Sequence, residues 1–145
     1  MKIKKVLSLA FVTIFVVLMF SACSKVSSDP IKLAEALQEE DYTVSFLVDS
    51  EDIRDFAKEY DIEYKGIEYI LCVTPENSYS YAVYQPREIG YFIYCEKTNG
   101  AKEMVDDIEK IARNSDFDEN ISEFTVERKG KVVFFGSSEI WDEMN

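Results

Sequence analysis

Four stretches of the chain space their apolar residues as an amphipathic helix does. After Ser50, for example, Ile53, Phe56, Ala57 and Tyr60 follow the i, i+3, i+4, i+7 pattern. Start signals support the assignments, such as an N-cap residue followed directly by proline. The pattern predicts helices after Asp29-Pro30 (with Ile31, Ala34 and Leu37 on the apolar side), after Ser50, from about Ala101 to Arg113, and after Ser137 or Ser138.

Other stretches alternate with the period of a strand. Tyr42, Val44, Phe46 and Val48 share one face, which predicts a half-buried strand. Three β-rich runs follow, and short turn segments separate them: "GIEYILCVT", "SYSYAVYQ" and "EIGYFIYCEK". The stretch "EFTVERKGKVVFFG" predicts a hairpin that turns at Lys129-Gly130.

The expected order is therefore α-β-α-β-β-β-α-β-β-α. Because short turns join most neighbouring strands, we expect a mainly antiparallel sheet in a two-layer α+β fold, with the helices packed on one face. The chain has 145 residues, of which 47% are hydrophobic. That is enough for one packed domain, which we assign to residues 29–145.

The first 22 residues have the layout of a secretory signal peptide. Lys2, Lys4 and Lys5 form a positive start, and an uncharged, mostly apolar stretch runs from Val6 to Ala22. This stretch is slightly short for a membrane span, and it ends in two small residues. We expect residues 1–22 to be removed, although an ordinary secretory signal and an uncleaved anchor remain alternatives to the lipoprotein signal described next.

The sequence Phe20-Ser21-Ala22-Cys23 resembles the lipobox of bacterial prolipoproteins. It departs from the family at Phe20, where Leu, Val or Ile is usual. The resemblance implies a diacylglyceryl group on Cys23 and cleavage before it by signal peptidase II. Residues 23–28 then form the lipidated cysteine and a short polar tether. The expected location is the extracytoplasmic face of the cell membrane.

The mature region is also similar to small, uncharacterised surface lipoproteins of Gram-positive bacteria. The stretches that carry this similarity are "ALQEEDYTV", "EKTNGAKEMVDDIEK" and "VERKGKVVFFGSSEIW". These motifs are unspecific, and the resemblance implies no activity and no functional residue.

Charge excludes one class of partner. The formal net charge is −12, and removing the three leader lysines makes it −15. Such a surface repels phosphate backbones, so we expect no nucleic acid partner. The same charge argues against binding to anionic membrane or wall polymers.

The chain contains no histidine. This excludes histidine-based triads and the commonest general base and metal ligand. Cys72 and Cys95 are the cysteines that remain beside Cys23, and they are a candidate disulfide or a pair of buried thiols.

Two weaker signals involve calcium and tyrosines. Asp116, Asp118, Asn120 and Glu127 stand at positions 1, 3, 5 and 12 of an EF-hand-like frame, but Ile121 occupies the position that needs glycine. The alternative is an ordinary acidic loop. Tyr79 and Tyr81 share one face of their predicted strand, where they form a candidate binding surface or fill the core.

These observations favour a lipid-anchored extracytoplasmic protein that binds a protein or another envelope component, without catalysis and without a cofactor. A small-ligand or Ca²⁺-binding accessory lipoprotein is the alternative. A hydrolase that works without histidine is a third and weaker hypothesis.

Overall fold

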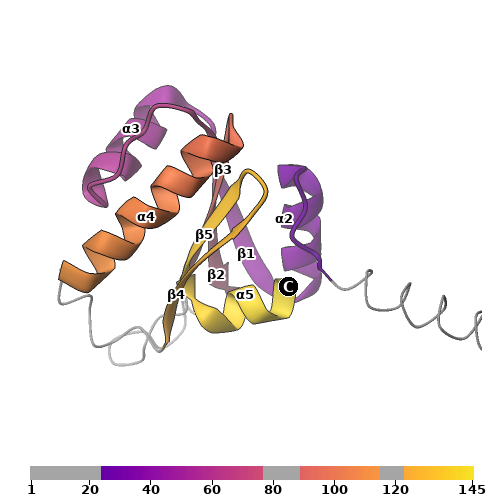
Figure 1. Ribbon diagram of the computed structural model, residues 1–145. Helices are drawn as coiled ribbons and strands as arrows, with labels where there is room; N and C mark the ends of the chain where they lie inside the picture. The colour runs from indigo at the N-terminus through magenta and orange to yellow at the C-terminus, as the bar shows by residue number, and fades with distance from the viewer. Residues whose placement is uncertain (1–23, 77–88, 115–122) are drawn as a thin grey trace, which may run out of the picture.

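The structure is a computed structural model that describes residues 24–76, 89–114 and 123–145. The helices pack around one sheet (Figure 1). In chain order the elements are α2 (Pro30–Glu39), β1 (Tyr42–Leu47), α3 (Ser50–Glu59), β2 (Ile67–Pro75), β3 (Gly90–Cys95), α4 (Thr98–Asn114), β4 (Phe124–Lys129), β5 (Val132–Ser137) and α5 (Ser138–Met144).

The described strands form one sheet in the order β1-β2-β3-β5-β4, and every neighbouring pair is antiparallel. The α+β class and the antiparallel sheet are thereby confirmed. The run "SYSYAVYQ", which we expected to form a further strand, lies outside the described residues.

Helices cover both faces of the sheet, so the expectation of a single helical layer is wrong. α2 and α5 pack on one face, and α3 and α4 pack on the other (Figure 1). We call the two interiors the first core and the second core. Successive residues of β3 enter them alternately: Phe92 and Tyr94 lie in the first core, and Ile93 and Cys95 in the second.

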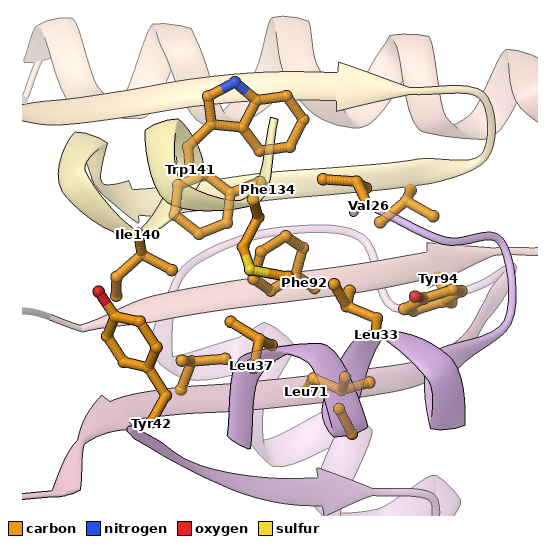
Figure 2. Packing of buried hydrophobic residues seen from close by; sticks show 14 residues of the cluster. Val26, Leu33, Leu37, Tyr42, Leu71, Phe92, Tyr94, Phe134, Ile140 and Trp141 are labelled. Atoms are coloured by element: carbon orange, nitrogen blue, oxygen red, sulfur yellow. The ribbon is translucent and has the colours of Figure 1, made fainter. Parts of the chain in front are cut away.

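Aromatic rings fill the centre of the first core. The ring centroids of Phe92 and Phe134 are 4.7 Å apart, and Trp141 of α5 stacks on Phe134 at 5.5 Å (Figure 2). Leu33 and Leu37 of α2 approach the same rings, and both are fully buried. This packing fixes α2 and α5 side by side on one face.

Local signals place the helix starts to within a few residues. Asp29 caps α2 as expected, and its carboxylate accepts a hydrogen bond from the Ile31 N–H at 3.0 Å. In α3 the cap is Asp49 and not Ser50, since Asp49 accepts from the Glu51 N–H at 2.8 Å. Ile31 is exposed and not buried, because Leu33 takes its expected place in the core.

Two strand predictions need correction. The hairpin turns at Gly130-Lys131, one residue later than expected, because Lys129 still pairs with Val132. On the face of β1 that was expected to be half-buried, Tyr42 is buried and Val44 half-buried, whereas Phe46 is exposed. β1 is an edge strand, and the first core extends along it only as far as Val44.

Gly136 lies where the neighbouring backbone leaves no room for a side chain. Its φ is 144°, and a Cβ there would lie 2.2 Å from the carbonyl oxygen of Ile89. We expect Gly136→Ala to lower the free energy of unfolding by more than about 2 kcal/mol, measured by urea titration. The control is Gly100→Ala in α4, where a Cβ meets nothing within 4 Å. That change should be neutral or stabilise by about 0.5–1 kcal/mol. Equal effects of the two variants would contradict the described register.

Candidate functional site

Residues 24–28 pack against the domain, and we call them the N-terminal strap. The backbone N–H groups of Lys25 and Val26 both donate to the carbonyl oxygen of Met144, at 2.7 and 3.1 Å. The Val26 side chain enters the first core and is only 5% exposed (Figure 2). The strap is therefore held by both backbone hydrogen bonds and apolar burial.

Side chains fix the two ends of the strap. The Tyr94 hydroxyl donates to the Ser27 carbonyl oxygen at 2.7 Å, and burial raises the pKa of this phenol far above its usual value. The Lys25 ammonium pairs with the Glu40 carboxylate, and this hydrogen bond raises the pKa of Lys25. The hydrogen bond from Tyr94 joins the strap to β3, whereas the exposed ion pair adds little stability.

The strap changes the expected picture of a free polar tether. Ser24 lies beside Asn145, with 3.4 Å between the serine hydroxyl and the asparagine side-chain oxygen. The start of β1 reaches the same end of the domain, because the Tyr42 hydroxyl donates to Glu143 at 2.5 Å. Cys23 lies outside the described residues, and Ser24, the next residue in the chain, is the first described one.

Cys72 and Cys95 are free thiols, and the strand register explains why the candidate disulfide is wrong. Cys72 pairs with Tyr91, while Cys95 pairs with Ile67. The cysteines are thus about 13 Å apart along the sheet, at about 3.3 Å per residue. A disulfide allows at most about 6.8 Å between Cα atoms.

A group of phenols surrounds Cys72 in the second core. The hydroxyls of Tyr60 and Tyr91 are 2.7 Å apart, and both rings pack on Phe56 and Phe135. Burial raises the pKa of both phenols and of the Cys72 thiol. All three groups stay protonated at neutral pH, so they stabilise packing and supply no ionised nucleophile.

The EF-hand-like frame cannot be assembled from the described residues. Asp116, Asp118 and Asn120 lie outside them. Glu127 lies on β4, exposed, and accepts a hydrogen bond from the Thr125 hydroxyl at 3.1 Å. Within residues 24–76, 89–114 and 123–145, no three cysteine or carboxylate side chains gather as metal ligands.

The candidate binding tyrosines, Tyr79 and Tyr81, also lie outside the described residues. Tyr91 and Tyr94 of β3 lie on opposite faces of the sheet, against the second and the first core respectively. Tyr69 is exposed on β2. It is close to Phe46 of β1 and to Val48, the residue after β1, since Leu47 pairs with Ile70, which follows Tyr69.

One small hollow lies between the α3–β2 loop and α4. It has a volume of about 70 Å³ and is lined by Ile62, Glu63, Lys65, Gly100, Glu103, Met104 and Asp107. Pockets for drug-sized ligands are several times larger, about 300–1,000 Å³. The hollow therefore suits a few waters better than an organic ligand.

Sequence reasoning missed two features that bear on function. The polar sequence "SKVSSD" predicts a free tether, and within it only Val26 indicates burial. The regular alternation of β1 predicts a half-buried strand over its whole length, although Phe46 in its second half is exposed. The six residues of β1 carry no charge or proline that would mark an outer strand, and its place at the edge depends on pairing with distant strands.

Thiol chemistry tests the register. In a Cys23→Ser background, we expect the intact mass to be the same with and without reductant. Cys95 should resist a thiol reagent at pH 8, because burial raises its pKa to about 11, and should react in urea. Cys72, which is half-buried, should react faster. A mass lower by a pair of hydrogens before reduction would contradict the register.

Strap docking predicts a stability effect at Val26. Val26→Asp should lower the free energy of unfolding by about 1.5–3 kcal/mol, the burial free energy of a valine. Ser28→Asp adds the same charge at an exposed strap position and is the control. Chemical denaturation of both variants measures the difference, and equal stability of the two would mean that the strap is not docked.

Comparisons with protein-family models, with curated proteins and with solved structures find no match to this chain. Among the described residues, no helix is both long and apolar enough to cross a membrane.

Proposed function

We propose that this protein is a lipid-anchored extracytoplasmic binding protein without catalytic activity. Cys23 carries the diacylglyceryl group, and the folded domain binds a protein or another component of the cell envelope. The observation that carries the proposal is the sequence "FSAC" at the end of an apolar leader, followed immediately by the docked strap.

The strap supports an anchor at this position. A lipid on Cys23 would be one residue from Ser24, which lies against the domain beside Asn145. The membrane would then face the end of the domain where α5 ends. A double acyl chain gives stable attachment, so this arrangement needs no second membrane contact.

Binding is favoured over catalysis by the chemistry of the side chains. The chain has no histidine, and the buried phenols and thiols are protonated at neutral pH. Exposed apolar side chains, in contrast, gather at one end of β1 and β2. Contact surfaces on proteins combine such apolar residues with a polar rim.

The second candidate, a small-ligand or Ca²⁺-binding lipoprotein, has less support. Its sequence hint is the segment from Asp116 to Glu127, and of the four candidate ligands in it only Glu127 is among the described residues. The hollow beside α4 is acidic but small, and Lys65 neutralises part of its charge. A rise in melting temperature with millimolar Ca²⁺, above a magnesium control, would favour this candidate.

The anchor is tested by fractionating cells that express full-length variants. Cys23→Ser should move the protein from the membrane fraction to the medium, because it removes the thiol that accepts the lipid. Cys72→Ser is the matched control and should stay in the membrane. A Cys23→Ser protein that remains fully membrane-bound would contradict lipid anchoring.

Partner binding is tested by cross-linking the tagged, anchored protein in its own membrane and identifying what co-purifies. A stoichiometric protein or envelope component supports the proposal. Turnover of a cell-wall substrate by the purified protein would contradict the non-catalytic role.

A further inference from the structure

β1 is an edge strand without the features that normally protect an edge. Its residues, "YTVSFL", include no charged side chain and no proline, and the register with β2 shows no bulge. The opposite edge, β4, ends in Glu127, Arg128 and Lys129. Charges of this kind block unwanted pairing, so among the described strands β1 is the open edge of the sheet.

The backbone of an edge strand has unused hydrogen-bonding groups. β1 bonds β2 on one side, so every second residue directs its N–H and C=O outward. Among the described residues, no backbone hydrogen bond reaches residues 43–47 from any other segment. An extended peptide can pair with such a row of donors and acceptors.

Apolar side chains are exposed along the second half of this edge. Phe46 is 41% exposed and Val48 62% exposed, and Tyr69 of β2 lies beside them. These three residues, which we call the β1 patch, lie on the sheet face that α2 covers nearer the start of β1. They supply apolar contacts for the side chains of a paired strand.

Acidic residues border β1 at both ends. Glu39, Glu40 and Asp41 precede it, and Asp49, Glu51 and Asp52 follow it, with no basic residue anywhere in residues 39–53. Lys25 forms an ion pair with Glu40 and so neutralises one of these six carboxylates. It does not pair with the other five. A segment that pairs with β1 would therefore meet negative potential at both of its ends.

We propose that β1 binds an extended segment of a protein partner by strand addition. The segment alternates apolar residues, which contact the β1 patch, and carries lysine or arginine at both ends, beside the two acidic borders. This inference rests on the proposed binding function and assigns it a surface and a partner chemistry.

The same charges disfavour a second copy of this chain as the occupant. An antiparallel β1–β1 pair would bring residues 39–41 of one copy next to residues 49–52 of the other. Both groups are acidic, so the pairing is repulsive. Anionic lipid headgroups are disfavoured for the same reason.

The β1 patch also lies away from the proposed anchor. The start of β1 is near Ser24 and Asn145, through the contacts of Tyr42 with Glu143 and of Lys25 with Glu40. β1 runs from there toward Phe46 and Val48, so the patch is at the other end of the strand (Figure 1). A partner could reach it while the strap end faces the membrane.

The test uses a displayed library of random short peptides, selected on the full-length lipidated protein in detergent. The selected peptides should alternate apolar residues between basic ends, and raising the salt concentration should weaken their binding. Hydrogen exchange with a selected peptide bound should slow at backbone amides of residues 43–48. Sedimentation of the free protein should show a monomer.

Two variants make the test specific. Phe46→Lys places a charge on the open edge and should weaken binding of the selected peptides at least about tenfold. Tyr64→Lys is the matched control, because Tyr64 is 42% exposed and lies in the α3–β2 loop. It should leave binding unchanged. Both variants should keep the parent melting temperature.

Three results would overturn the inference. The first is a selection that enriches no peptide. The second is a set of enriched peptides that are acidic or that bind the Phe46→Lys variant as well as the parent, and the third is hydrogen exchange that a bound peptide slows only in elements other than β1. They would leave the proposed function standing if a partner still co-purified with the anchored protein. If the Cys23→Ser protein stayed in the membrane, the anchor would fail even though β1 bound its peptides.

Discussion

β3 and β5 have apolar side chains on both faces, and the rest of the structure depends on this constraint. Every residue of β5 is buried, and so are all of β3 except the half-buried Tyr91. A sheet centre of this kind must be covered on both sides. The helices meet that need in pairs, with α2 and α5 over Phe92 and Phe134, and α3 and α4 over the other face. β1 and β4, at the edges, are left with less cover.

The strap completes one of these layers and connects it to the proposed anchor. Val26 joins the first core with residues of α2 and α5, and the backbone of residues 25–26 bonds the last turn of α5. Because the strap is part of the domain, a lipid at Cys23 would fix which end faces the membrane. The open edge of β1 then becomes accessible along its length, with its apolar end farthest from the anchor.

Local patterns predicted the elements better than their arrangement. Asp29-Pro30 located the start of α2, and the spacing of Ile53, Phe56 and Ala57 gave the buried side of α3. The number of helical layers was missed, although "VVFF" and "YFIYC" lack the alternation of a strand with one wet face. Strand register, which separates Cys72 from Cys95, depends on tertiary pairing that no local pattern encodes.

Native-state hydrogen exchange at the backbone amides of Lys25 and Val26, in the lipidated protein, tests the central claim most directly. Both amides donate to Met144, and Val26 is buried. They should therefore exchange about as slowly as the amides of Phe92 and Phe134 in the core. Exchange at the rate of an unfolded chain would contradict the account, because the strap would then be a free linker and the domain would have no fixed orientation on the membrane.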